Sequence, residues 1–309
     1  MRIGVIVGGP SPERDGSYLS GEAAQKALTS LGHTADLVDM SDGFWRSISQ
    51  YDVAFIAGHG WYAEDGKLQG LLEILGVPYT GSGVLASAVG MHKPTFKMLM
   101  RAHKIPTAPW AVLRPGSSAA EIATVIEELG LPLFVKPSSS GESLAAGIAR
   151  SSDDVAQLIG AVEEFAPQEY IVEPLLQGNT VTVGILEIDG RLEALPALEA
   201  IAHNEFYDSQ AKSDPHFRTY RCPAPLAPEV ADTIQDLAVK VFIACECRGV
   251  ARVDFMMGPD GPVVLEVNTV PGLTHQGNLA AMAQAFGLDY QRMIDVILSS
   301  ATGRPAYCP

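Results

Sequence analysis

The chain has 309 residues, 47% hydrophobic and 18% charged, an ordinary globular composition with length for two or three domains. The net charge of −15 argues against nucleic acid or an anionic membrane as the main partner, so an anionic ligand needs a local basic site. No apolar run approaches the roughly 18 residues of a membrane span, and the N-terminus does not resemble a signal peptide. The cysteines lack CxxC spacing, which favours reduced thiols in the cytoplasm.

Residues 1–90 alternate between apolar strands and helices. The pattern predicts strands over 2–7, 34–38 and 53–57, and helices over 20–31 and 68–75. This order indicates a parallel sheet, whose ligands bind beyond the carboxyl ends of the strands. Two segments follow such ends, 8–14 (GGPSPER) and 58–66 (GHGWYAEDG). The first lacks GxGxxG spacing and is also compatible with a turn and helix cap, and a lone His59 is more often structural.

Residues 84–174 read as an α+β unit. We expect one helix over 87–101 carrying Lys93, a capped helix over 119–129, and a strand over 133–136 ending in Lys136. The Ser/Gly-rich segment 137–147 follows, and its small residues would let backbone N–H groups approach phosphate oxygens. It is not a Walker A loop, and a surface hairpin explains it equally well.

Residues 175–309 form the third predicted unit. A hairpin is expected over 181–188 and 191–198, and helices over 228–244, 279–286 and 290–298. Between them, residues 203–220 are polar and irregular. A long segment of this kind is either an active-site lid or a disordered surface loop.

A second hairpin carries the most unusual pattern. Two β-branched runs, 250–257 and 263–267, flank a Gly-Pro-Asp-Gly-Pro turn. If Asp260 lies at the centre of the turn, alternation places four polar residues on one face, with Arg252 opposite Asn268 and Asp254 opposite Glu266. The other face would carry apolar side chains only, those of Val253, Phe255, Leu265 and Val267.

Directly opposed Asp254 and Glu266 would destabilise the hairpin unless a cation lay between them. Together with the amide oxygen of Asn268 they form an all-oxygen set, which suits Mg²⁺, or Mn²⁺, bridging phosphate oxygens. The alternative is an exposed hairpin in which Arg252 forms a salt bridge with either acid.

The stretch RVDFM…LEVNTVPGLT resembles the C-terminal signature of ATP-grasp ligases, and among them the D-alanine–D-alanine ligase family. The resemblance extends to GGPSPER, HGWYAEDG, PYTGSG and YDSQAK. It implies an α/β chain with the three-domain ATP-grasp fold: an N-terminal parallel-sheet domain (1–83), an α+β central domain (84–174) and an α+β C-terminal domain (175–309). It also implies a cytoplasmic homodimer in peptidoglycan biosynthesis that uses ATP, Mg²⁺ and amino acids.

The resemblance assigns roles residue by residue. Glu13 would hold the amine of the first amino acid, with His59 near the substrates, and Arg252 and the Gly272 N–H would stabilise the oxyanion of acyl transfer. Lys212 would reach the phosphates from the lid. The remaining nucleotide contacts would come from Lys93, Lys136, Ser143, Glu173, Leu175, Leu176, Thr180, Met256 and Glu266.

Several positions depart from the family. Glu142 replaces a serine of the phosphate loop, and Ser213 replaces the tyrosine after the lid lysine. Gly277 replaces a serine that helps hold the carboxylate of the second substrate, and Asn278 replaces an apolar residue. Thr180 stands where an acid binds ribose, and His92 where an acid precedes the first lysine. These departures predict that D-alanine paired with D-alanine is a poor substrate pair.

The residue set favours carboxylate activation by ATP. A carboxylate does not react with an amine until the γ-phosphoryl group converts it into an acyl phosphate, and such transfer requires positioning and charge neutralisation rather than a protein nucleophile. Three readings stay open: a ligase of the D-alanine–D-alanine type, the same chemistry on other substrates, as in a specialised-metabolite pathway, and a non-catalytic binding relative.

Overall fold

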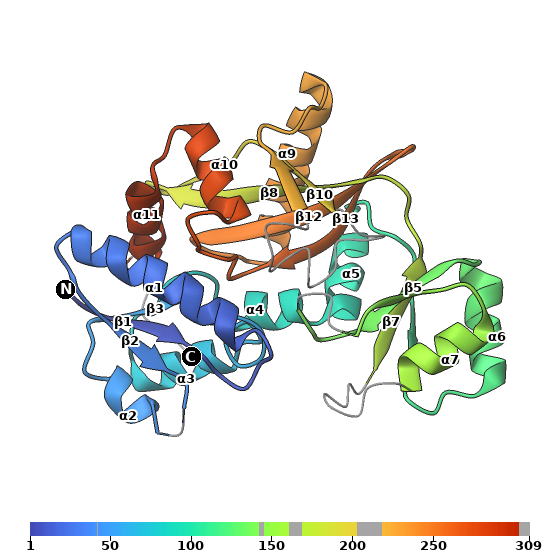
Figure 1. Cartoon of the computed structure of the whole chain (residues 1–309), viewed down its shortest axis with the longest axis horizontal. Helices are drawn as coiled ribbons and strands as arrows, with labels where there is room; N and C mark the ends of the chain where they lie inside the picture. The colour runs from blue at the N-terminus through green and yellow to red at the C-terminus, as the bar shows by residue number, and fades with distance from the viewer. Residues whose placement is uncertain (42, 142–144, 161–168, 203–217, 303–309) are drawn as a thin grey trace.

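The computed structural model describes residues 1–41, 43–141, 145–160, 169–202 and 218–302. It contains three sheets arranged along the long axis of the molecule: a small N-terminal sheet at one end, a large sheet in the middle and a central-domain sheet at the other end (Figure 1). Within these ranges, none of the helices has both the length and the apolar character that a membrane span requires.

The N-terminal sheet is parallel, as predicted. Its order is β2 (Thr34–Asp39), β1 (Arg2–Val7), β3 (Val53–Ile56). Helices α1 (Arg14–Ser30), α2 (Trp45–Ile48) and α3 (Lys67–Leu75) accompany it. Helix α1 begins six residues before the predicted start at residue 20, because its first turns carry polar residues that hide the helical pattern. The segments after β1 and β3 lie side by side at the edge where their strands end.

The central-domain sheet, at the other end of the molecule from the N-terminal sheet, is antiparallel. Its order is β4 (Ala111–Leu113), β7 (Tyr170–Pro174), β5 (Leu133–Pro137), β6 (Gly147–Ala149), with α6 (Ala119–Leu129) and α7 (Ser152–Gly160) packed on it. The single helix predicted over 87–101 is wrong. His92 is extended and separates α4 (Val84–Met91) from α5 (Lys93–Ala102), and its ring accepts the N–H of Thr95 as an N-cap. Pro94 in the first turn suits this start.

The large sheet has the order β11 (Arg218–Arg221), β10 (Leu198–Ala202), β8 (Asn179–Ile188), β12 (Val250–Gly258), β13 (Gly261–Asn268), and β9 (Arg191–Ala194) pairs with β8. The strand predicted over 191–198 is therefore two strands, β9 and β10, separated by residues 195–197. Helices α9 (Pro228–Ala244), α10 (Asn278–Phe286) and α11 (Tyr290–Thr302) complete the unit.

The two faces of the large sheet differ. One face is apolar throughout and packs on α5 and α9 through residues such as Val183, Val253 and Phe255. The opposite face is apolar at one end, where Leu186 and Val250 pack with α10, α11 and the N-terminal sheet. Further along the same strands its side chains become polar, so the fold leaves a polar patch where the helical cover ends.

The register predicted for the hairpin of β12 and β13 is correct at the polar residues but wrong at the turn. Arg252 pairs with Asn268 and Asp254 with Glu266. However, the turn contains two residues between Gly258 and Gly261, and a bulge between Asp254 and Phe255 restores the register. As a consequence Val264, rather than the predicted Leu265, fills the core opposite Phe255.

Candidate active site

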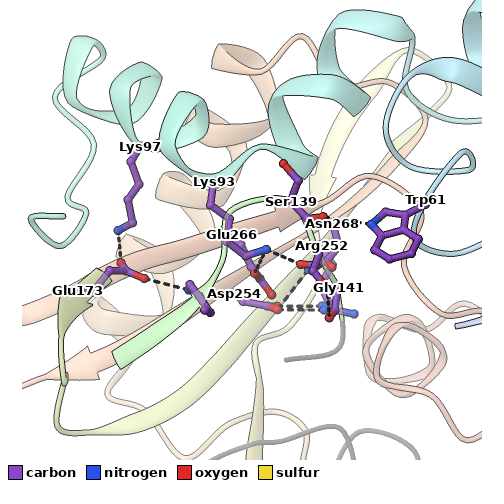
Figure 2. Close-up of polar contacts among 12 residues, drawn as sticks. Trp61, Lys93, Lys97, Ser139, Gly141, Glu173, Arg252, Asp254, Glu266 and Asn268 are labelled. Carbon is purple, nitrogen blue, oxygen red and sulfur yellow. Dashed lines mark hydrogen bonds and ion pairs between the residues drawn. The ribbon is translucent and has the colours of Figure 1, made fainter. Parts of the chain in front are cut away.

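The polar patch is built from neighbouring positions on three strands. Thr182 of β8, Asp254 of β12 and Glu266 of β13 form one row across the sheet, and Arg252 and Asn268 lie in the next row. Directly paired residues share a face, so the register alone gathers these side chains. Figure 2 shows Arg252, Asp254, Glu266 and Asn268 close together. Sequence analysis missed Thr182, although it lies two residues after Thr180 on the same strand face.

Asp254 accepts hydrogen bonds from three neighbouring side chains. Arg252 donates to it through two nitrogens, at 2.8 and 2.9 Å. The Thr182 hydroxyl donates at 2.6 Å and the Asn268 amide nitrogen at 3.2 Å. The salt bridge that sequence analysis considered as an alternative is therefore real. It fixes the guanidinium of Arg252 beside the acid pair.

Two lysines flank the acid pair. The Lys93 ammonium lies 4.0 Å from Glu266 and donates to the carbonyl of Ser140. Ser140 belongs to the Ser/Gly-rich segment 137–147 that is predicted to cover the phosphates, called the phosphate-covering segment below. The Lys136 ammonium lies 2.9 Å from Glu173. Burial by itself would lower the pKa of Lys136, but the carboxylates of Glu173 and Glu266 outweigh it and raise that pKa above its ordinary value. Lys136 is therefore charged at neutral pH.

Glu173 has a second partner that sequence analysis missed. Lys97, one turn beyond Lys93 on α5, lies 2.5 Å from its other oxygen and is completely buried. A signal existed in the sequence: Lys97 lies beside the buried Phe96 and one turn before Met100, on the apolar side of an amphipathic helix.

The loop after β1 supplies Glu13, which is buried and lies between two glycines. A Cβ on Gly141 would lie 2.2 Å from its carboxylate oxygen, and a Cβ on Gly60 would lie 2.7 Å from the same oxygen. The indole of Trp61 donates to the Ser139 carbonyl at 3.1 Å. The N-terminal loops and the phosphate-covering segment therefore meet around Glu13.

His59 and Glu64 hold the turn that follows β13. The ring of His59 bonds to the Ser20 hydroxyl at 2.9 Å and to the backbone of Val270, while Glu64 bonds to the N–H groups of Gly60 and Val270. Burial lowers the pKa of His59 to about 4 and raises that of Glu64 to about 7. His59 is thus neutral at physiological pH and bonds to the turn that leads to Gly272.

Several of the residues predicted to contact the nucleotide lie on or directly after β7, β8 and β12. Thr180 pairs directly with Met256, on the same face as the acid pair. The N–H of Leu175 already donates to the carbonyl of Pro132 at 2.9 Å, so Leu175 can offer a base only its carbonyl oxygen. Leu176 directly follows it.

Gly277 and Asn278 lie at the start of α10, with Gly277 as the N-cap residue. A Cβ on Gly277 would lie 3.1 Å from the hydroxyl oxygen of Thr274. The predicted residues Glu142, Ser143, Lys212 and Ser213 lie outside the described residues.

Comparison with known proteins resolves the family. Residues 99–299 match the D-ala D-ala ligase C-terminus and residues 41–82 the D-ala D-ala ligase N-terminus. The D-alanine–D-alanine ligase of Geotalea uraniireducens is 39% identical over 307 residues, covering 97% of this chain and 95% of that protein. The enzyme of Syntrophotalea carbinolica is 38% identical, with 98% and 97% covered.

The crystal structure of D-alanine–D-alanine ligase from Bacillus anthracis complexed with ATP superposes with a TM-score of 0.85, at 30% identity, covering 98% of this chain and 97% of that one. This chain belongs to the D-alanine–D-alanine ligase family. It is therefore an ATP-dependent ligase with the ATP-grasp fold, and the reading as a non-catalytic relative is set aside.

For this ligase, the donor chemistry of the patch fits a hard divalent cation. Asp254 and Glu266 offer carboxylate oxygens, and Asn268 offers an amide oxygen while its amide nitrogen donates to Asp254. The two acid side chains are 14% and 25% exposed, which leaves them accessible from solvent. Within the described residues no group of three or more His, Cys, Asp or Glu side chains could hold a metal ion. The two acids would therefore depend on phosphate oxygens and water to complete a coordination shell.

The close approach of Gly141 to Glu13 gives a first prediction for this ligase. Gly141→Ala should push the Glu13 carboxylate from its place, because the added Cβ would lie 2.2 Å from its oxygen. We expect KM for the first amino acid to rise about tenfold, which corresponds to about 1.4 kcal/mol, with little change in nucleotide affinity. Steady-state kinetics at saturating ATP measures this.

The matched control is Gly160→Ala at the end of α7, where the added Cβ would have no neighbour within 4 Å. An unchanged KM for the amino acid in Gly141→Ala would show that Glu13 does not bind the substrate amine.

Proposed function

We propose that this ligase joins two molecules of D-alanine into D-alanyl-D-alanine, with release of ADP and phosphate. The relatives' names support the substrate. The observation that carries the proposal is the polar patch in which Lys93 and Arg252 flank the Asp254–Glu266 pair (Figure 2). Glu13 lies against Gly141, next to Ser140, whose carbonyl accepts from Lys93.

The proposed reaction begins with phosphoryl transfer. A carboxylate oxygen of the first D-alanine attacks the γ-phosphorus of ATP, and ADP leaves. Lys93 and Lys136 offset the negative charge of the phosphates, and the carboxylate of Glu13 holds the amine of the first D-alanine in place. The product is an acyl phosphate, whose carbonyl carbon is electrophilic and whose leaving group is phosphate.

The second step forms the peptide bond. The neutral amine (–NH₂) of the second D-alanine attacks that carbon, and the carbonyl oxygen becomes an oxyanion. Phosphate departs as the carbonyl re-forms, and the nitrogen releases one proton to the departing phosphate or to water. The guanidinium of Arg252, held in position by Asp254, and the N–H of Gly272 are the proposed oxyanion donors.

We include Mg²⁺ or Mn²⁺ in the proposal, held by Asp254, Glu266 and Asn268. When bound, the ion would neutralise the phosphate oxygens and polarise the γ-phosphoryl group. The proposal also includes a homodimer in the cytoplasm, as the family resemblance implies, and light scattering in solution tests the dimer.

A second candidate function is the same reaction with a different second amine. It is favoured by Gly277 and Asn278, which remove a hydroxyl and add a polar side chain where the second carboxylate is expected to bind. Against it, the hydroxyl of Thr274 lies 3.1 Å from the position of a Cβ on Gly277, close enough to supply a hydroxyl in that region. This favours D-alanine at both sites.

The test is ADP release with D-alanine alone and with D-alanine paired with each member of a panel of D- and L-amino acids and simple amines. The proposal predicts that D-alanine alone drives ADP release and that mass spectrometry finds D-alanyl-D-alanine. If kcat/KM for another second substrate exceeds that for D-alanine tenfold or more, the second candidate replaces it.

A further inference from the structure

Among the residues that the structure describes, Lys97 is the most deeply buried charged side chain near the site, and the proposed reaction assigns it no role. It is fully buried on α5, and its partners connect it to β7 and to the hairpin of β12 and β13. All three of its protons have acceptors: Glu173 at 2.5 Å, the Thr107 hydroxyl at 2.9 Å and the Ala108 carbonyl at 3.3 Å. Thr107 in turn donates to the Val264 carbonyl of β13 at 3.1 Å.

A buried ion pair of this kind needs a reason beyond stability. Well-packed apolar residues in place of such a pair are often as stable or more stable, because removing two charges from water carries a large penalty. Burial lowers the pKa of Lys97, and the nearby Glu173 carboxylate counters only part of that effect. The ammonium is therefore held at an energetic cost, which points to a functional role.

Glu173 is shared between two lysines. One carboxylate oxygen faces Lys97 at 2.5 Å, as Figure 2 shows. The other oxygen faces Lys136 at 2.9 Å. Burial alone would raise the pKa of Glu173, but the two ammonium groups outweigh burial and lower it. Two cations thus contact one buried anion, and Glu266 is a second, more distant carboxylate that acts on both of them.

The two lysine side chains differ in solvent exposure. The Lys97 side chain is fully buried, whereas the Lys136 side chain is 14% exposed and lies at the end of β5, directly before the phosphate-covering segment. Only Lys136 can turn toward a phosphate. If it did so without Lys97 present, Glu173 would remain buried with no counter-charge, which is strongly unfavourable.

We propose that Lys97 is a positioning residue: it serves as the permanent counter-ion of Glu173 and so releases Lys136 to bind the nucleotide phosphates. This inference rests on the proposed function, because it assumes that Lys136 meets the phosphates of ATP. Without the Lys97 charge, Glu173 would retain Lys136 and nucleotide affinity would fall.

The test is a double-mutant cycle on ADP affinity, measured by calorimetry on the full chain. Lys97→Met should weaken ADP binding about tenfold when Glu173 is present, because Glu173 then competes with phosphate for Lys136. In the E173Q background the same change should alter affinity less than twofold, because no carboxylate holds Lys136. Lys97→Arg keeps the charge and should restore most of the affinity.

A purely structural role for Lys97 would weaken ADP binding equally in both backgrounds, and that result would overturn the inference, as would unchanged affinity in Lys97→Met. Should Lys97→Met fail to fold by circular dichroism, Lys97→Gln takes its place, since it can still donate to Thr107 and Ala108 without a charge.

Activity of the wild-type chain distinguishes failure of the proposed function from failure of the proposed role of Lys97. If it releases no ADP with any amino acid, the proposed function fails. If it is active and the mutant cycle shows no coupling, only the role of Lys97 fails.

Discussion

Asp254→Asn is expected to abolish ligation while the fold stays intact. The substitution keeps the shape and one acceptor oxygen for the Thr182 hydroxyl, but it removes the charge that would face the metal and that pairs with Arg252. Loss of metal-based charge stabilisation is worth several kcal/mol, so kcat should fall about a thousandfold or more. Amino-acid-dependent ADP release at saturating ATP and Mg²⁺ measures it.

The matched control for this prediction is Asp260→Asn, in the exposed turn of the same hairpin, which should retain wild-type activity. Glu266→Gln is the companion variant and should behave as Asp254→Asn does. If either active-site variant kept more than a tenth of the wild-type Mg²⁺-dependent rate, the assignment of the acid pair to the metal would be wrong.

Arg252→Met should reduce kcat by about 10² to 10³, the range seen when one fixed oxyanion donor is lost. The bidentate contact with Asp254, at 2.8 and 2.9 Å, holds the guanidinium in a single orientation, so its N–H groups are aimed before substrate arrives. The kcat of Arg252→Lys should lie between those of the wild type and Arg252→Met, because an ammonium keeps the charge but cannot reproduce the planar two-point contact.

Binding and chemistry can be separated for Arg252. ADP affinity should change little in Arg252→Met, whereas the rate of product formation in a single turnover should fall with kcat. Arg191→Met, at an exposed end of β9, is the control for loss of one positive charge. A variant in which ADP affinity and the single-turnover rate fell by the same small factor would indicate a general electrostatic role for Arg252 instead of an oxyanion role.

The polar face of the hairpin could be predicted from sequence because it depends on local rules. Side chains alternate along each strand, so the polar residues fall on one face by pattern alone. The pairing of Asp254 with Glu266 was predicted correctly because the turn centre assumed at Asp260 and the unpredicted bulge offset each other. The bulge could not be predicted, because either Val264 or Leu265 satisfies an apolar pattern. Only packing against Phe255 selects Val264 for the core.

Contacts between distant segments explain what sequence reasoning missed. Lys97 meets Glu173 across 76 positions of the chain, and Trp61 meets Ser139 across 78, and no periodicity encodes either contact. Likewise, the helix break at His92 depends on its side chain capping α5 and on a bond to Glu169 at 3.0 Å. Residue types indicated which chemistry to expect, but only the fold shows which side chains meet.

The most direct test of the proposed reaction is isotope transfer from the substrate carboxylate. The chain is incubated with ATP, Mg²⁺ and D-alanine whose two carboxylate oxygens are both ¹⁸O, and the phosphate is examined by mass spectrometry. Acyl phosphate formation predicts one ¹⁸O in each phosphate released, with one ¹⁸O retained in the new peptide carbonyl. Unlabelled phosphate, or label appearing in AMP, would contradict activation of the carboxylate by the γ-phosphoryl group.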